Sequence, residues 1–264
     1  MRISVRVLPL LLLFFMADPG DAASQTADST DQYQSMSHVL ERAYELHMSG
    51  DEHQALTIYR DVLNEDSKNL EALWNSSVIH AKIGHRKESK EEKRDEFEKS
   101  MELAQRAVSN HPGSGHAHYA MAVANGRMTE IMGPGDKIDA SRKVKQHISR
   151  AAELLPNFAP IWHLYGVWHS DVANMSGAVK AAAGLFSGGI PDASNEKAEE
   201  YLRKAISLDE DNILFHLDLA KHYLEVDEPE KARPLLKEVQ DMEPQMKDDP
   251  GYIKEAEEML DALG

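Results

Sequence analysis

Residues 198–220 read AEEYLRKAISLDEDNILFHLDLA, and this stretch begins and ends on two alanines, Ala198 and Ala220, that lie 22 positions apart. Apolar residues recur within it at helical spacing, and the alternation that is typical of a β-strand is absent. Three further pairs of mostly small residues keep the same separation. They are Ala55 and Ser77, Ser100 and Ala122, and Val144 and Gly166. Four equal spacings along an irregular chain indicate an internal repeat.

A helix–turn–helix unit of about 34 residues accounts for these pairs. Its eighth and twentieth residues are small because two antiparallel helices approach closely there. Position 8 holds Ala43, Ser77, Ala122, Gly166 and Ala220, and position 20 holds Ala55, Ser100, Val144, Ala198 and Ala232. Pro112, Pro156 and Pro244 fall near position 32, where the second helix must end. With this pattern the chain resembles the tetratricopeptide repeat (TPR) family.

The predicted fold is therefore all-α, a TPR-like α-solenoid of about five repeats over residues 36–244. The repeats are expected at about 36–69, 70–114, 115–158, 159–212 and 213–246, and residues 247–264 are expected to form a capping helix with an acidic outer face. Repeats 2 to 4 carry extra residues between positions 8 and 20, which should lengthen helices and loops. In repeat 2 the extra stretch, His85–Lys99, is almost entirely charged and should extend the second helix into solvent.

A narrower resemblance covers Trp162 to Pro244. There a Trp-x-x-x-Gly helix precedes the segment Gly184-Leu-Phe186, a linker containing Pro191 and an Ala-x-x-Tyr-Leu-x-x-Ala helix that starts at Ala198. This order is similar to that of the regulator of microtubule dynamics proteins. The resemblance implies a TPR-like fold, and the eukaryotic members of that family are described as microtubule-associated. We transfer the fold from this resemblance and leave the partner open.

The N-terminus predicts an exported protein. Arg2 and Arg6 precede an apolar run of eleven residues, Val7–Ala17, which is too short to cross a bilayer as a helix. Small residues follow it, so residues 1–22 are predicted to be a signal peptide that is cleaved after Ala22. Residues 23–35 are polar and should form a flexible spacer. The expected location is periplasmic or secreted, with no membrane insertion after cleavage.

Composition and motifs argue against nucleic-acid binding, metal binding and catalysis. A formal charge of −16 argues against nucleic acid as a partner, and a chain without cysteine has no disulfide, thiolate zinc site or iron–sulfur cluster. The sequence has no Walker motif, dinucleotide fingerprint or G-x-S-x-G. Its thirteen histidines lack convergent ligand spacing: His163 and His169, like His216 and His222, are six apart and point to different helix faces. We expect no cofactor, no metal and no enzyme activity.

The first helices of stacked repeats should line a concave groove through positions 2, 5, 9, 12 and 13 of each repeat. Aromatic, histidine and basic side chains at the groove positions suit an extended peptide or an acidic segment. The candidate groove residues are Tyr44, His47, Trp74, Tyr119, Arg127, His163 and Lys221. The predicted function is a non-catalytic protein–protein interaction scaffold that binds an unknown protein or peptide, with Trp74 and Tyr119 as apolar anchors and Arg127 as an ionic clamp.

Two alternatives stay open. Trp74 and Tyr119 could simply fill the groove, and the interaction would then lie on the inserted segment around Leu185 and Phe186. The protein could also be an enzyme or a small-ligand or metal binder that uses histidines of the middle repeats. A separate expectation concerns packing: Gly166, at position 8 of repeat 4, should touch a neighbouring helix near Val144.

Overall fold

A computed structural model describes residues 36–177, 180 and 190–264. The predicted signal peptide (1–22), the predicted spacer (23–35) and the alternative patch at Leu185 and Phe186 lie outside these residues. The chain divides into two compact units, Met1–Val39 and Leu40–Gly264. All helices from α2 onward belong to the second unit, and the helix formed by residues 36–48 begins in the first.

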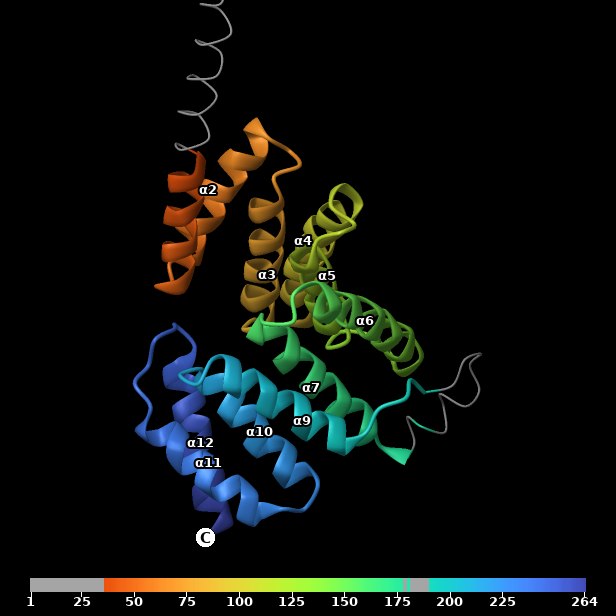
Figure 1. The fold of residues 1–264 in the computed structure, drawn as a ribbon, viewed down its shortest axis with the longest axis vertical. Coiled ribbons are helices and arrows are strands. Elements are labelled where there is room, and N and C mark those ends of the chain that lie inside the picture. Colours follow the sequence, from red (N-terminus) through yellow and green to blue (C-terminus); the bar gives the residue numbers. More distant parts are fainter. Residues whose placement is uncertain (1–35, 178–179, 181–189) are drawn as a thin grey trace, which may run out of the picture. The chain divides into compact units, whose positions relative to one another are not determined.

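The described residues form helical hairpins, with no strand among them (Figure 1). We name the first helix of each hairpin A and the second B. The A helices are 36–48, α3 (Leu70–His85), α5 (Gly115–Met128), α7 (Ala159–Ala173) and α10 (Ile213–Glu225). The B helices are α2 (Glu52–Glu65), α4 (Lys90–Asn110), α6 (Pro134–Leu154), α9 (Asn195–Leu208) and α11 (Pro229–Asp241), and α12 (Asp249–Leu263) follows them. The all-α prediction of stacked hairpins with a final helix is confirmed.

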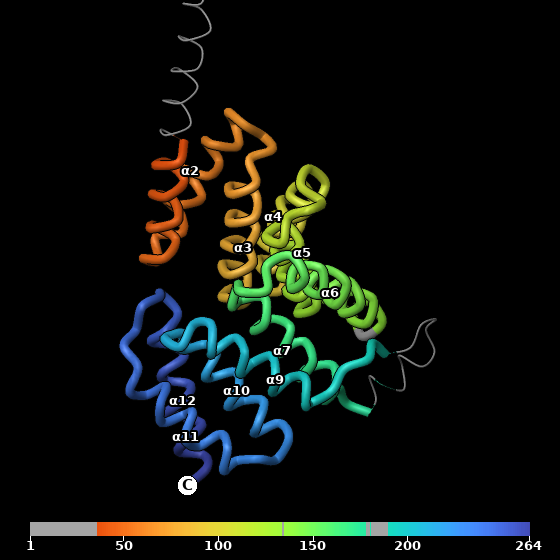
Figure 2. The backbone as a smooth tube through the Cα atoms, viewed as in Figure 1, coloured from red at the N-terminus to blue at the C-terminus, as the bar shows by residue number. Residues whose placement is uncertain are grey.

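Each hairpin packs on the next along the chain, as the backbone trace in Figure 2 shows. Helix α4 lies against α3 and α5, α6 against α5 and α7, and α9 against α7 and α10. Neighbouring A helices also touch directly, in the pairs α3 with α5 and α7 with α10. These two pairs hold the two groups of candidate functional residues. In the part of the chain that is described, no helix is both long and apolar enough to cross a membrane.

Polar side chains at the helix starts explain why the hairpin turns fall where they do. Asn69 Oδ1 accepts a hydrogen bond from the Ala72 amide at 3.0 Å, and the hydroxyls of Ser89 and Ser194 accept from amides three residues ahead. These bonds satisfy amides that have no partner inside the helix. Prolines stand in the first turns of α6, α7 and α11, where the missing N–H costs nothing.

The small residues at positions 8 and 20 meet inside each hairpin. Ser77 of α3 donates its hydroxyl to the Ser100 carbonyl of α4 at 2.8 Å, and both residues are fully buried. In repeat 4 a Cβ built on Gly166 would lie 2.6 Å from Leu202 Cγ and 3.1 Å from the Ala198 carbonyl oxygen. These nearest atoms all belong to α9, so the expectation that Gly166 meets Val144 is wrong. The glycine instead admits the partner helix of its own hairpin.

The extra residues of repeats 2 and 3 lengthen their B helices, as predicted: α4 and α6 each have 21 residues. The stretch His85–Lys99 is not wholly in solvent, however. Phe97 is fully buried, and its ring lies over Gly84 of α3, where a Cβ would come within 2.7 Å of two ring carbons. One aromatic residue within a charged run therefore ties the lengthened helix to the core.

The final helix closes the apolar core at the C-terminal end. Ala256 of α12 is fully buried in a cluster that includes Leu217, Tyr223 and Leu236 from α10 and α11. The exposed residues of α12 include Glu257, Glu258 and Asp261, as is expected of a solubilising cap.

Candidate functional site

The predicted anchors Trp74 and Tyr119 lie in one aromatic cluster on α3 and α5. Trp74 stacks on His116 with ring centroids 4.9 Å apart, and the Tyr119 ring stands perpendicular to Phe158 at 5.4 Å. Phe158 also contacts Trp74 and His116, so it connects the two anchors. All four residues are partly buried. Phe158 was missed from sequence because it precedes α7, in a turn between repeats.

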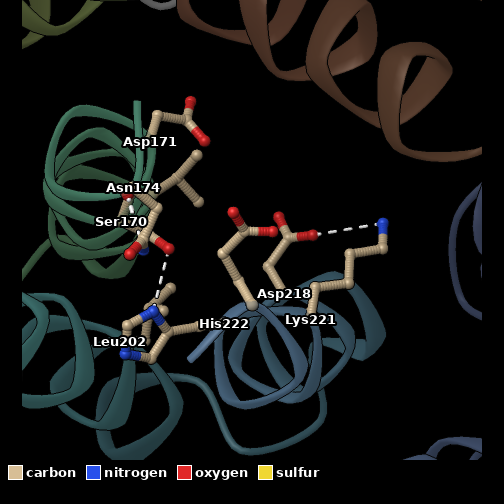
Figure 3. Close-up of a pocket in the computed structure, with 9 residues that line it drawn as sticks. Ser170, Asp171, Asn174, Leu202, Asp218, Lys221 and His222 are labelled. Carbon is tan, nitrogen blue, oxygen red and sulfur yellow. Dashed lines mark hydrogen bonds and ion pairs between the residues drawn. The ribbon is translucent and has the colours of Figure 1, made fainter. Parts of the chain in front are cut away.

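A pocket of about 270 Å³ lies between α7 and α10 (Figure 3). Its walls include positions 9, 12 and 13 of repeat 4 and positions 9 and 13 of repeat 5, together with the residue that follows α7, other residues of α10 and one of α9. The lining residues are Val167, Ser170, Asp171, Asn174, Leu202, Asp218, Lys221, His222 and Glu225. Of the predicted groove residues only Lys221 is among them. Three carboxylates face one lysine and one histidine, so the pocket is acidic.

The carboxylate of Asp218 has ion-pair and hydrogen-bond partners within the described part of the chain, whereas those of Asp171 and Glu225 have none there. Asp218 accepts from His163 Nε2 at 2.8 Å and lies 3.4 Å from Lys221 Nζ, and Lys221 also pairs with Glu255 of α12 at 3.0 Å. Asp171 and Glu225 make no ion pair or hydrogen bond through their side chains to any described residue. Reduced hydration within the pocket, then repulsion from Asp218 and Glu225, raises the pKa of Asp171 to about 6, although this side chain stays open to solvent. The pocket therefore offers two carboxylates that make no ion pair with a described residue, although the charge of Arg127 partly offsets the rise in the pKa of Asp171.

Arg127, the predicted ionic clamp, is already engaged. Its guanidinium donates to Glu130 Oε1 at 2.9 Å and approaches His85 Nδ1 at 3.0 Å. Glu130 also accepts from Lys93 Nζ at 2.8 Å. Burial opposes ionisation of Glu130, but the hydrogen bonds from His85 and Lys93 and the charge of Arg127 outweigh it and lower its pKa to about 2. Arg127 is thus one member of a local ion-pair group.

The two groove residues of the first A helix differ in environment. Tyr44 is exposed, with 45% of its surface accessible. His47 is enclosed, and neither of its ring nitrogens has a hydrogen-bond partner among the described residues. Burial, followed by the charges of Lys82 and Arg86, lowers the pKa of His47 to about 3. His47 therefore stays neutral at physiological pH.

The histidines of the middle repeats do not assemble a metal site. Within residues 36–177, 180 and 190–264, no group of three or more His, Asp or Glu side chains is placed to hold a metal ion. His118 and His147 meet as a pair, with their Nδ1 atoms 2.9 Å apart, and His169 is buried and accepts from the Ser194 amide at 3.2 Å. In these contacts the three histidines pack against neighbouring helices and turns.

The stacked hairpins and their small-residue contacts define a TPR-like α-solenoid. A TPR protein of Thermus thermophilus has a similar structure, with a TM-score of 0.60 at 18% identity, and the match covers 83% of this chain and 97% of that one. At this identity the likeness shows the fold alone.

The family follows from the sequence comparisons. The family described as regulator of microtubule dynamics protein 1-3 matches residues 39–264, and this chain belongs to it. Regulator of microtubule dynamics protein 1 of Bos taurus is 29% identical over 229 residues, which cover 84% of this chain and 70% of that protein. Regulator of microtubule dynamics protein 2 of Mus musculus is 26% identical over 198 residues, 75% of this chain but only 48% of that protein.

The predicted periplasmic or secreted location is wrong. The relatives are mammalian proteins named for microtubule dynamics, and microtubules are found neither in a periplasm nor outside cells. The prediction failed because a short apolar run after two arginines is a compositional feature, and composition of that kind does not specify a compartment.

Proposed function

We propose that this chain is a non-catalytic scaffold that binds a basic segment of a partner protein along the concave faces of α3, α5, α7 and α10. The observation that carries the proposal is the acidic pocket between α7 and α10, where Asp171 and Glu225 form no ion pair with a described residue. A lysine or arginine side chain would pair with them. The aromatic cluster on α3 and α5 would hold apolar side chains of the same segment.

The net charge of −16 supports a basic partner over the acidic segment that the groove positions first favoured. The relatives are named as regulators of microtubule dynamics, so a microtubule-linked protein is the first class of partner to test. The experiment uses the full chain as bait, beside a Trp74→Ala/Tyr119→Ala variant and a Lys90→Ala control at an exposed helix start. A partner that binds in the groove is captured by the wild type and the control and lost with the double variant. If every captured protein binds all three baits equally, the groove is not the binding surface.

Trp74→Ala should weaken binding of such a partner by about 2 kcal/mol, or roughly thirtyfold, because truncating an aromatic anchor removes its buried contact. Tyr119→Ala should act similarly, since Phe158 joins the two rings in one cluster. Titration calorimetry with the isolated partner segment measures both affinities. Circular dichroism must show preserved helicity, because both rings also pack within their repeats. Unchanged affinity in folded variants would exclude this cluster as an anchor.

Binding should also depend on pH through Asp171. Its pKa of about 6 lies above the ordinary aspartate value, so its carboxyl group gains a proton as the pH falls from 7.5 to 5.5. A basic segment then loses one attractive charge, and we expect its affinity to fall several-fold, about 1 kcal/mol for a partly exposed pair. Asp171→Asn should bind at pH 7.5 as weakly as the wild type does at pH 5.5 and should lose this part of the pH dependence. An identical pH profile in the variant would show that another group titrates.

A further inference from the structure

Charged side chains join the first hairpin to the start of the last helix. The Arg86 guanidinium, at the end of α3, donates to both carboxylate oxygens of Asp248, at 3.1 and 2.9 Å, and to Glu52 at the start of α2. Lys247 lies 3.6 Å from Glu52 and 3.4 Å from the Gly50 carbonyl oxygen. We call Glu52, Arg86, Lys247 and Asp248 the polar clasp. The contact between Lys247 and Gly50 joins residues that are 197 positions apart in the sequence.

The clasp is charge-balanced and partly shielded from water. Glu52 is 5% exposed, whereas Arg86 and Asp248 keep 30% and 24% of their side-chain surface. Burial lowers the pKa of the neighbouring Lys82, and the carboxylates of Asp248 and Glu52 act against that shift. Asp249 is buried and accepts from the amides of Gln245 and Met246, which fixes the turn that presents Lys247 and Asp248.

The apolar clusters at the two ends that the clasp joins share no residue with each other, and they are linked through the clusters of the middle hairpins α5 to α9. The cluster around α10 and α12 draws its residues from α7 and later elements, and the clusters around α3 draw theirs from α2 to α5. Neither group includes a residue from the other side. Ion pairs at such a junction weaken with salt, because added ions screen charges that water reaches. This junction can therefore open without disrupting either core.

The clasp borders the concave face. His47 and Lys82 occupy groove positions 12 and 13 of repeats 1 and 2, and both lie in the field of the clasp charges. On the other side, Glu255 of α12 pairs with the groove residue Lys221 of α10, with Nζ and Oε1 3.0 Å apart. The start of α12 is thus held close to the groove residues by the clasp.

We propose that the polar clasp closes the concave face and must open before a partner segment can enter. The claim that a partner enters rests on the proposed function, whereas the claim that the clasp opens is independent of it. If the closed state dominates, the apparent association constant equals the intrinsic association constant multiplied by the fraction of molecules in the open state. Weakening the clasp then strengthens binding, and locking it abolishes binding.

Opening is tested without any partner. The chain has no cysteine, so Ser49→Cys and Gln245→Cys, both at exposed sites beside the clasp, carry a unique pair of spin labels. In low salt we expect one short label-to-label distance. Arg86→Gln, or 1 M salt, should shift most of the population to longer distances with helicity unchanged. Arg150→Gln removes an arginine that pairs within one helix, with Glu153, and should leave the distance as it is. A short distance that persists in Arg86→Gln and in 1 M salt would overturn the proposal.

Gating is tested with a partner segment found through the groove experiment. Arg86→Gln should bind it about tenfold more tightly than the wild type or Arg150→Gln. A short bis-maleimide bridge between the two introduced thiols of the Ser49→Cys/Gln245→Cys variant should abolish binding, whereas the same variant blocked with a monofunctional maleimide should bind normally. Equal binding by bridged and blocked protein would refute gating even if the labels separate. If no groove-dependent partner exists, the proposed function fails, while the label distances still decide whether the clasp opens.

Discussion

Gly166→Leu should destabilise the protein by about 3 kcal/mol or more, since overpacking a close helix contact costs about 1–3 kcal/mol and this contact involves backbone. A Cβ at this site would lie 2.9 Å from the Leu202 amide nitrogen and 3.1 Å from the Ala198 carbonyl oxygen. Side-chain movement alone cannot relieve these contacts, so α7 and α9 must separate. Even Gly166→Ala should therefore lower the melting temperature.

Gly126→Ala is the matched control, because Gly126 is also helical and its added Cβ would meet only Val144, at 4.0 Å. There the higher helix propensity of alanine should leave stability unchanged or raise it by up to about 1 kcal/mol. Chemical denaturation of both variants measures the difference. If Gly166→Ala is as stable as Gly126→Ala, the close approach of α7 and α9 is incorrect.

Phe97→Ala should cost about 3–5 kcal/mol, the usual range for a fully buried phenylalanine. The ring covers Gly84, which has no side chain that could fill the resulting cavity. The loss should free the N-terminal half of α4, whose other residues are mostly charged. Hydrogen exchange of α4 amides should therefore rise together with the fall in unfolding free energy.

Glu98→Ala provides the comparison for that variant, because it changes the next residue of the same helix at an exposed position. Its stability should stay within about 0.5 kcal/mol of the wild type. Equal effects of Phe97→Ala and Glu98→Ala would mean that the charged half of α4 projects into solvent, as the sequence alone predicts.

The hairpins could be predicted from the sequence because the contacts that determine them recur in every repeat and lie within a single hairpin. Positions 8 and 20 must be small wherever two helices cross closely, so the repeated 22-residue spacing of small residues indicated the hairpins, and in the structure Ser77 meets Ser100 and Gly166 lies against Ala198. The prediction failed on the direction of one contact, because a small residue signals a close approach and does not say which helix approaches. Gly166 meets α9 and not the region of Val144.

The candidate site was predicted only in part. Trp74 and Tyr119 follow from groove position 5, and the structure brings them together, but through Phe158, which stands outside any groove position. Arg127 has the predicted position, yet its charge is taken up by Glu130. A position in a repeat predicts the direction of a side chain and carries no information on which neighbour neutralises it.

By itself the sequence determined the all-α repeat architecture, the hairpin pairing and the lengthened B helices, because helical periodicity and small-residue spacing act over tens of residues. Only the tertiary structure decided the acidic pocket between α7 and α10 and the contact of Arg86 with Asp248. Those two residues are 162 positions apart, and their meeting depends on the summed rotation of every hairpin between them. Small differences in each crossing accumulate along a solenoid, and no local pattern records their sum.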